Sequence, residues 1–217
     1  SSKSRRKTAK EQQDTQNFCH FLQKLENRFN AEYKPASESA VQACNGIMKS
    51  LESNFEFGAP RHEIFEQKDL NGYQSKSLPE IIFLGKCNSG KSTLLNNLLT
   101  NAKKTDLMKL ARASKIAGYT KMLNVYNVSN RFKIVDSPGY GVKGTVEQGD
   151  VTMNYLLKRK NLRRVYLLAS ALTGLNHYDS AIIDFLIENA IPFEIVWTKM
   201  DKITPRLEPI LIDNIEK

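Results

Sequence analysis

The sequence predicts a three-layer α/β fold, in which helices cover both faces of a mostly parallel sheet and an α-helical extension precedes the sheet. From residue 80 onward, strand-like apolar runs alternate with segments of helical periodicity, as in proteins with a parallel sheet. A glycine-bounded loop, residues 85–92, joins the first such strand to the first such helix. The 217 residues, 41% of them hydrophobic, are enough for one domain with an extension.

Composition limits the classes of binding partner and the cellular compartments that we expect for this protein. The net charge of +9 favours a polyanionic partner, with nucleic acid ahead of an anionic membrane surface. No apolar run is long enough to cross a bilayer, so we expect no transmembrane segment. Cys19, Cys44 and Cys87 are odd in number and widely spaced, which speaks against a disulfide framework or a zinc site and favours a reducing compartment.

Residues 1–78 are expected to form a basic tail, two helices and a connector. Ser1–Lys10 holds five basic residues and no acid, which predicts disorder and is typical of the remainder of an organelle-targeting segment or of an arbitrary chain end. Apolar residues at three- and four-residue steps predict helices over 12–34 and 37–51. The inward positions are Phe18, Phe21, Leu22, Leu25 and Phe29 in the first helix, and Val41, Cys44, Ile47, Met48 and Leu51 in the second. We expect these faces to pack on the following domain, with Cys44 as a small buried hydrophobe; docking to a partner is the alternative.

The remaining elements follow in order. Residues 53–78 are interpreted as a connector with one short edge strand, and residues 79–217 as the α/β domain. Strands are predicted at Glu80–Leu84, Met122–Val128, Arg131–Asp136, Arg164–Ser170 and Pro192–Thr198. Ser129-Asn130 is expected to make a hairpin turn between the second and third of them. Helices are predicted from the glycine-bounded loop to about Asn101, through Tyr155–Leu157, and over Tyr178–Asn189.

The glycine-bounded loop reads G-x-x-x-x-G-K-S and indicates a phosphate-binding P-loop. Glycines let backbone N–H groups close around phosphate oxygens, and the following helix adds the positive end of its dipole. We expect Lys91 to reach the β- and γ-phosphates and Ser92 to place its hydroxyl on Mg²⁺. The nucleotide-binding residues predicted in this segment are Gly85, Asn88, Ser89, Gly90, Lys91, Ser92 and Thr93.

Two further motifs stand at strand ends, where ligands bind in open α/β sheets. Asp136-Ser137-Pro138-Gly139 is a D-x-x-G pattern; Asp136 could hold Mg²⁺ through water, and the Gly139 N–H could sense a γ-phosphate. Thr198-Lys199-Met200-Asp201 places a carboxylate that could accept two hydrogen bonds from the Watson–Crick edge of guanine. Lys199 would lie across the base. Without the P-loop, the two motifs would be interpreted as an ordinary turn and a helix N-cap.

Six stretches together resemble the EngB/YihA family of GTPases, and they cover roughly residues 79–203 in the family's order. They are G-K-C-N-S-G-K-S-T-L-L-N-N-L (85–98), A-R-A-S-K-I-A-G-Y-T-K (111–121), D-S-P-G-Y-G (136–141), Y-L-L-K-R-K-N-L (155–162), L-T-G-L-N-H-Y-D (172–179) and I-P-F-E-I-V-W-T-K-M-D-K (191–202). The resemblance implies a P-loop GTPase domain, dependent on Mg²⁺, that assists assembly of the large ribosomal subunit.

The resemblance also implies roles that the residues alone do not show. Thr120 falls where the family's switch I threonine binds Mg²⁺ and the γ-phosphate, so the expected catalytic set is Lys91, Thr120 and Gly139. Tyr140 stands where Ras-like proteins have a water-orienting glutamine, which implies slow intrinsic hydrolysis or assistance from elsewhere. Asn88 stands where potassium-dependent relatives place a cation ligand; stabilising the loop is the alternative.

The resemblance implies a location and an expected end to the domain. A long, basic, helical N-terminal extension is not typical of the short bacterial members, so we expect an organellar and specifically mitochondrial protein, with the cytoplasm as the alternative. The family continues after the guanine motif with a strand, a guanine loop and a final helix, and we expect residues 79–217 to lack them. We expect a monomer.

Basic residues gather in two clusters that the sequence places beside the nucleotide-sensing loops. The first cluster is Lys103, Lys104, Lys109, Arg112, Lys115 and Lys121, and the second is Lys158, Arg159, Lys160, Arg163 and Arg164. We expect them to present a basic surface to ribosomal RNA in the GTP state; two solvated faces are the alternative. A nucleotide-dependent RNA-binding module with negligible turnover is the second functional hypothesis. A P-loop kinase or ATPase conflicts with Asp201.

Overall fold

The computed structural model describes residues 13, 16–17, 19–25, 27–28, 36–61, 63–65, 78–99, 122–141 and 146–216. Its helices are α2 (Glu38–Ser50), α4 (Lys91–Leu99), α6 (Val146–Lys158), α7 (His177–Glu188), the 3₁₀ turn η1 (Met200–Lys202) and α8 (Glu208–Glu216). Its strands are β1 (Ser53–Ala59), β2 (Glu80–Gly85), β3 (Leu123–Val128), β4 (Phe132–Asp136), β5 (Leu162–Ser170) and β6 (Phe193–Thr198). Every strand predicted after residue 79 is therefore confirmed to within two residues at each end.

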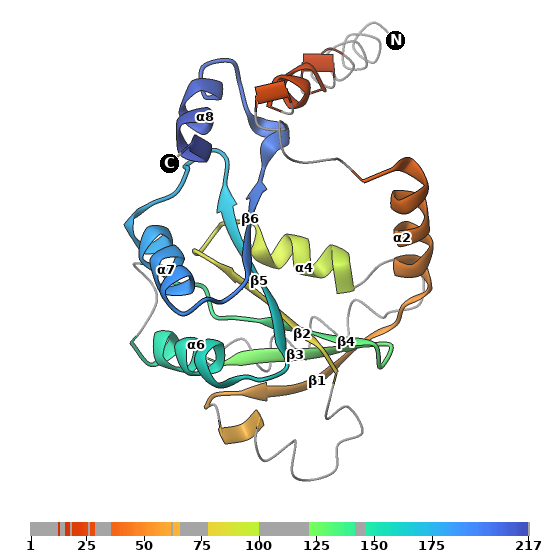
Figure 1. The fold of residues 1–217 in the computed structure, drawn as a ribbon, viewed down its shortest axis with the longest axis vertical. Helices are drawn as coiled ribbons and strands as arrows, with labels where there is room; N and C mark the ends of the chain where they lie inside the picture. Colours follow the sequence, from red (N-terminus) through yellow and green to blue (C-terminus); the bar gives the residue numbers. More distant parts are fainter. Residues whose placement is uncertain are drawn as a thin grey trace, which may run out of the picture.

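One six-stranded sheet in the order β1-β3-β4-β2-β5-β6 forms the centre of the molecule (Figure 1). β4, β2, β5 and β6 run parallel, whereas β1 and β3 add two antiparallel pairings at one edge. β1 is the edge strand expected in the connector, and it joins the same sheet as the strands of the α/β domain. The predicted mostly parallel α/β sheet is confirmed.

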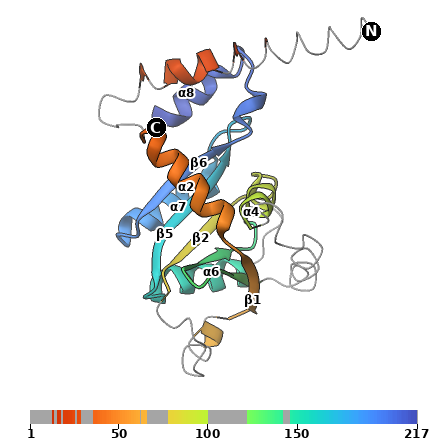
Figure 2. The same cartoon turned by 90° about the vertical axis from the view of Figure 1, so that its right-hand side faces the viewer.

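Helices cover the two faces of the sheet and enclose separate cores (Figure 2). On one face, Leu95 and Leu99 of α4 pack against a cluster that includes Phe83, Ile134 and Leu168. On the other face, α6 and α7 pack against a second cluster, with Tyr155 at its centre and 0% exposed. Since the central strands are buried on both faces, their near-continuous apolar runs follow directly from the three-layer arrangement.

Local sequence signals explain several boundaries. Ser129 and Asn130 both adopt positive φ, 48° and 53°, which is the backbone a two-residue hairpin needs to match the twist of its strands. At the start of α7, Asn176 caps the helix: its side chain accepts hydrogen bonds from Tyr178 N and Asp179 N. The Asp179 side chain accepts from the backbone of Asn176 in return, so the helix has a complete capping box.

The first N-terminal helix packs against the end of the chain, as expected. Phe21 is buried, 6% exposed, in a cluster with Ala171 and Leu211 of α8. Lys24 Nζ lies 3.2 Å from Glu208 Oε1, and Arg28 makes a second ion pair with Glu216. The predicted packing on the following domain is therefore confirmed for the described part of this helix, while Phe18 and Phe29 lie outside the described residues.

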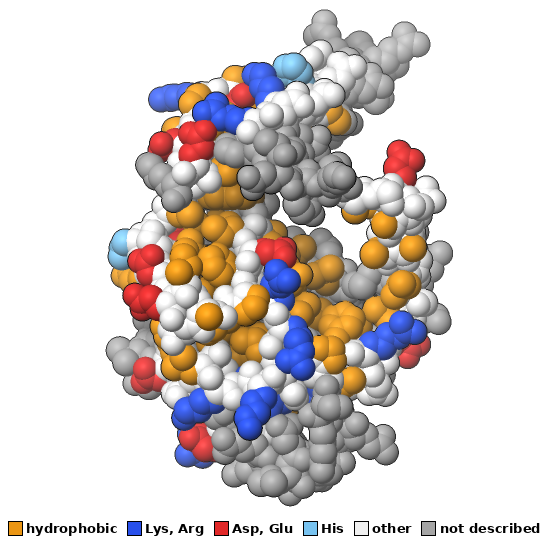
Figure 3. Space-filling model, viewed as in Figure 1, with side chains coloured by type: hydrophobic (Ala, Val, Ile, Leu, Met, Phe, Trp, Pro, Cys, Tyr) orange, Lys and Arg blue, Asp and Glu red, His pale blue; other side chains and the backbone are white. Residues whose placement is uncertain are grey.

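The same expectation is wrong for most of α2. Val41 and Ile47 are 47% and 48% exposed, and Cys44 is exposed rather than buried. Among the predicted inward residues whose burial the structure describes, only Leu51, just past the helix, is buried; the side chain of Met48 lies outside that description. Figure 3 shows apolar side chains uncovered on this helix. An apolar stripe indicates which face a helix could bury, but burial also requires a surface opposite that face, and α2 projects beside the sheet edge.

A buried ion pair fixes the carboxyl end of α6 to the start of β2. Glu80, 0% exposed, accepts hydrogen bonds from Arg159 Nε at 2.9 Å, Arg159 NH2 at 2.6 Å and the Tyr155 hydroxyl at 2.7 Å. Burial and the neighbouring carboxylate raise the pKa of Tyr155 well above its ordinary value, so its hydroxyl stays a donor.

Among the described helices, none is long and apolar enough to span a membrane.

Candidate nucleotide-binding site

The predicted P-loop connects β2 to α4 at the carboxyl edge of the sheet. Two of its positions need unusual backbone: Asn88 has φ 68°, and Gly90 has φ 93°, which side chains with a Cβ rarely adopt. Gly85 is also tightly enclosed, because an added Cβ would lie 2.5 Å from Ser89 Oγ. Since α4 begins at Lys91, the loop delivers its N–H groups to the positive end of a helix dipole.

A cavity of about 570 Å³ opens above this loop. The predicted site residues that line it are Asn88, Gly90, Lys91, Ser92, Thr93, Gly139 and Lys199, and Lys86 and Cys87 complete the lining. Three segments distant in sequence therefore meet at one cavity: the P-loop, the D-x-x-G turn and the T-K-M-D turn. Gly85 and Ser89 lie beneath it, at the end of β2 and in the buried part of the loop.

Lys91 connects the P-loop to the D-x-x-G turn. Its ammonium makes an ion pair with Asp136 Oδ1 and donates a 2.6 Å hydrogen bond to the carbonyl oxygen of Ser137. Ser137 is buried and its hydroxyl donates to Phe83 O at 2.8 Å, which holds the start of the turn on β2. The Lys91 side chain is only about 10% exposed, so its charge acts where water screens little.

The D-x-x-G turn is also joined to the P-loop through the backbone. Tyr140 N donates to Gly85 O at 3.4 Å, and Cys87 N donates to Tyr140 O at 3.3 Å. These two bonds extend the parallel pairing of β2 and β4 past the ends of both strands. Gly139 consequently lies close to the loop, since a Cβ there would come within 3.1 Å of Cys87 Sγ.

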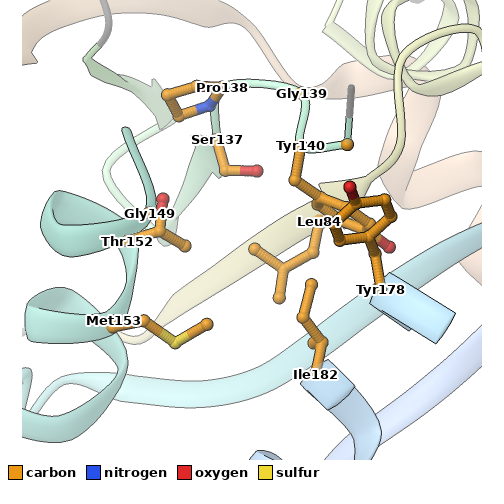
Figure 4. Close-up of a pocket in the computed structure, with 11 residues that line it drawn as sticks. Leu84, Ser137, Pro138, Gly139, Tyr140, Gly149, Thr152, Met153, Tyr178 and Ile182 are labelled. Carbon is orange, nitrogen blue, oxygen red and sulfur yellow. The ribbon is translucent and has the colours of Figure 1, made fainter. Parts of the chain in front are cut away.

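The Tyr140 side chain reaches toward α7, close to Tyr178 (Figure 4). Its hydroxyl donates a 2.5 Å hydrogen bond to Asp179 Oδ1. Burial, and next the bond to Asp179, raise the pKa of Tyr140 above its ordinary value, so the phenol remains protonated. Beneath the ring lies a smaller cavity of about 210 Å³ with a largely apolar lining that includes Leu84, Met153 and Ile182.

The T-K-M-D turn is joined to the P-loop from the opposite side. The Thr198 hydroxyl donates to Ser89 O, and Lys199 Nζ donates a 2.7 Å bond to Asn88 O. Lys199 has φ 58°, which sends the chain out of β6 and into η1. Asp201 is exposed and makes no hydrogen bond or ion pair with the described residues, so its carboxylate is accessible from solvent.

The structure therefore brings together most of the predicted site, and it adds residues that the sequence did not indicate. Asp136 joins the cavity through Lys91, and Thr198 through Ser89. Thr120 lies outside the described residues. The residues that sequence reasoning missed are Ser137 and Asp179. The sequence placed Asp179 only within the helix predicted over Tyr178–Asn189, and no local signal pairs it with Tyr140.

The donor set at the cavity fits Mg²⁺. Asp136 supplies one carboxylate and Ser92 an exposed hydroxyl, both hard oxygen ligands at the phosphate-binding loop. Among the described residues no group of three His, Cys, Asp or Glu side chains could hold a metal alone. Mg²⁺ keeps several waters and takes one or two protein ligands together with phosphate oxygens.

The second basic cluster differs from its prediction in two ways. Arg159 is buried against Glu80, and Arg164 is paired with Glu194 at 2.9 Å, so Lys158, Lys160 and Arg163 remain as the exposed basic group. This group lies where α6 ends and β5 begins, at the opposite edge of the sheet from the cavity. The predicted position beside the nucleotide-sensing loops is therefore wrong, because α6 carries the chain roughly 20 Å away. The first cluster lies outside the described residues.

The chain is similar to several known proteins. Residues 80–199 match the family described as 50S ribosome-binding GTPase. The chain is 42% identical over 196 residues to MIOREX complex component 8 of Saccharomyces cerevisiae, which covers 83% of this chain and only 62% of that protein. It is 37% identical over 177 residues to the probable GTP-binding protein EngB of Wolbachia pipientis, covering 79% of this chain and 84% of the relative. A solved structure of Aquifex aeolicus Era with GDP and AlF4⁻ matches at a TM-score of 0.42 and 28% identity, over 64% of this chain and 47% of that one. The chain therefore belongs to the EngB-type GTPases, within the family of 50S ribosome-binding GTPases.

Proposed function

We propose that this protein is a Mg²⁺-dependent GTP switch that hydrolyses GTP slowly and assists assembly of the large ribosomal subunit in mitochondria. The observation that carries the proposal is the meeting of three motifs at one cavity, with Lys91 between the P-loop and Asp136. Each motif would recognise a different part of GTP. The P-loop would bind the phosphates, the D-x-x-G turn the metal and the γ-phosphate, and the T-K-M-D turn the base.

For the phosphates, Lys91 and the N–H groups of residues 88–92 are the proposed ligands. Lys91 would exchange part of its contact with Asp136 for β- and γ-phosphate oxygens, since both are acceptors for the same ammonium. Ser92 and Thr120 would bind Mg²⁺ directly, with Asp136 supporting it through water. The metal would neutralise phosphate charge during transfer, and the Gly139 N–H would bind the γ-phosphate.

For the base, Thr198, Lys199 and Asp201 are the proposed readers. Lys199 is already held over the P-loop by its bond to Asn88 O, which fixes the plane against which a purine would lie. The exposed Asp201 carboxylate would accept from guanine N1–H and N2–H₂, a donor pair that adenine lacks. GTP should therefore bind several orders of magnitude more tightly than ATP, and equal affinities in a competition titration would contradict this assignment.

Slow hydrolysis follows from Tyr140. Its hydroxyl is bonded to Asp179, so it is not free to orient an attacking water as an amide would. We expect an unassisted rate on the order of 10⁻⁴ s⁻¹ or below. A K⁺ ion near Asn88 is the proposed source of assistance; it would raise phosphate release in KCl relative to NaCl, and Asn88→Ala would remove the difference. Equal rates in both salts would exclude the cation.

The ribosomal and mitochondrial parts of the proposal rest on the relatives and on charge. The matched family is described as binding the 50S subunit, and the yeast relative is eukaryotic. The segment Ser1–Lys10 is basic and free of acidic residues, a composition that organelle-targeting segments share. Lys158, Lys160 and Arg163 give an exposed basic group that could contact ribosomal RNA phosphates, whereas nucleotide dependence would have to come from elements at the cavity edge.

Co-sedimentation with mitochondrial large ribosomal subunits tests the proposal. The protein is spun with subunits at low and moderate salt, with GDP or a non-hydrolysable GTP analogue. We expect more protein in the pellet with the analogue, and less at the higher salt. Reversal of Lys158, Lys160 and Arg163 to Glu should reduce binding, while reversal of Arg131 and Arg206, exposed basic residues elsewhere, should not. Binding indifferent to nucleotide and salt would contradict the proposal.

Turnover separates the proposal from its alternative. A nucleotide-dependent RNA-binding module with negligible turnover would bind the same subunits but release no more phosphate than one equivalent. Multiple-turnover phosphate release in the presence of subunits would exclude that alternative.

A further inference from the structure

Asp179 is a buried carboxylate that lies between the D-x-x-G turn and α7. It is only 3% exposed, and its two oxygens have different partners. Oδ2 accepts the backbone N–H of Asn176 at 2.9 Å and completes the capping box of α7. Oδ1 accepts the Tyr140 hydroxyl at 2.5 Å. Helix capping therefore explains the role of Oδ2 only, because Oδ1 is hydrogen-bonded to Tyr140, next to the D-x-x-G turn.

Together with two backbone hydrogen bonds, the bond to Asp179 restrains Tyr140 at three positions. Its backbone N–H and carbonyl bond to Gly85 and Cys87 of the P-loop, and its side chain bonds to Asp179. Gly139 immediately precedes it, so the position of the Gly139 N–H depends on these three restraints. The side-chain restraint is the one that reaches outside the phosphate-binding segments, to a helix whose start is fixed by its own cap.

Asp179 also borders the P-loop from the far side. A third cavity, of about 240 Å³, is lined by residues 86–89 of the loop, by Lys199 and by Asp179. Asp179 stands at N3 of α7, at the positive end of the helix dipole, and its two oxygens accept from two different donors. A hydrogen bond to a carboxylate is stronger than one to a neutral acceptor.

We propose that Asp179 is a positioning residue for the γ-phosphate: by holding the Tyr140 hydroxyl, it fixes the Gly139 N–H at the phosphate cavity. The proposal rests on the GTP-switch function above and deepens it. Because GDP has no γ-phosphate, loss of this restraint would cost GTP affinity and leave GDP affinity nearly unchanged. The same restraint would couple nucleotide state to the start of α7.

The test compares nucleotide affinities of variants in the full chain by fluorescent-nucleotide titration, with GDP and a non-hydrolysable GTP analogue. Tyr140→Phe removes only the hydroxyl, and Asp179→Ala removes the acceptor. We expect either change to lower the ratio of GTP-analogue to GDP affinity by about tenfold. The double variant should lower the ratio no further than the more severe single variant, because both changes break one bond. Asp179→Glu, which retains the acceptor charge, should restore part of the ratio.

Asn176→Ala is the matched control. It removes the α7 cap acceptor without touching Tyr140, so it should lower stability while leaving the affinity ratio unchanged. An unchanged ratio in Tyr140→Phe would overturn the proposal, as would an equal change in Asn176→Ala, which would assign the effect to helix stability. Failure of the wild-type protein to bind guanine nucleotide at all would instead contradict the proposed function, so the two failures are distinguishable.

Discussion

Two buried ion pairs stand at opposite ends of the same central strand, and they differ in how completely their charges are satisfied. At the amino end of β2, Glu80 is 0% exposed and receives three hydrogen bonds from Arg159 and Tyr155. At the carboxyl end, Lys91 meets Asp136, whose side chain is 21% exposed, beside a cavity of about 570 Å³. The Glu80–Arg159 pair is enclosed by protein and its hydrogen bonds are made within the protein, whereas the Lys91–Asp136 pair lies beside a cavity.

The difference separates a charge that holds the fold together from a charge that is available to a ligand. A planar guanidinium and a carboxylate fit each other at two points and leave little capacity for a third group. A lysine ammonium is a point charge with three donors, and two acceptors from the protein do not exhaust it. We therefore expect substitutions at the two ends to affect different measurements, and the predictions below test that division.

Glu80→Ala should have the largest effect, on stability. It leaves the Arg159 guanidinium buried without its carboxylate, so the free energy of unfolding should fall by about 3–5 kcal/mol. Urea denaturation measures this. Glu194→Ala is the control, because it breaks the exposed pair with Arg164 and should cost about 0–1 kcal/mol. A small loss in Glu80→Ala would remove the distinction between the two ends.

Lys91→Ala should lower nucleotide affinity strongly and the free energy of unfolding less than Glu80→Ala does. Affinity for GDP and GTP should fall together by about 100-fold, because the lost ammonium contacts phosphates in both nucleotides. The free energy of unfolding should change less than in Glu80→Ala, since Asp136 is left partly exposed. Isothermal titration and urea denaturation of the same preparation give both numbers. Nucleotide affinity equal to the wild type would mean that the P-loop assignment is wrong.

Ser92→Asn should have a smaller and more selective effect. By disturbing a proposed Mg²⁺ ligand, it should weaken GTP binding by about tenfold more than GDP binding, because the metal would neutralise charge on the γ-phosphate, which GDP lacks. Removing Mg²⁺ with a chelator should reproduce the same selectivity in the wild type and add little in the variant. If the variant lost GDP and GTP equally, the metal role of Ser92 would have to be withdrawn.

Buried tyrosines should give a modest dependence of stability on pH. The pKa of Tyr155 is raised in the folded state above its ordinary value of 10.0, so the unfolded chain loses its proton first as the pH rises. The contribution of Tyr155 to stability is therefore full below about pH 10 and is lost above it, by up to about 1.4 kcal/mol per pH unit. In Tyr155→Phe, the free energy of unfolding measured with urea should fall less steeply between about pH 10 and about pH 11, by that amount. An identical slope in the variant would contradict the raised pKa.

Local sequence patterns predicted the elements and motifs well because their determinants lie within a few residues. The apolar runs of β2, β4 and β6 end at turn residues, so their boundaries follow from the sequence. The P-loop spacing fixed the loop and the start of α4. α8 was not predicted: its apolar positions are interrupted by Pro209, which a first helical turn accepts because its N–H has no partner there.

Contacts between distant segments could not be predicted in the same way. Arg159 looked like one member of a basic cluster, yet it lies four residues after Tyr155 and faces the same buried Glu80. The apolar stripe of α2 looked like a buried face, but no described surface covers it. Whether a charge or a stripe is buried depends on which segment folds against it, and a single sequence does not contain that pairing.

The ion pairs that join the first helix to α8 are contacts between segments that lie far apart in sequence. Lys24 and Glu208 are separated by 184 residues, and Arg28 and Glu216 by 188. During synthesis from the N-terminus, the first helix therefore emerges well before the helix with which it pairs. Contacts of such high sequence separation form late and slowly. Until α8 is in place, Phe21 lacks its buried partner Leu211, so the apolar side of the first helix stays uncovered.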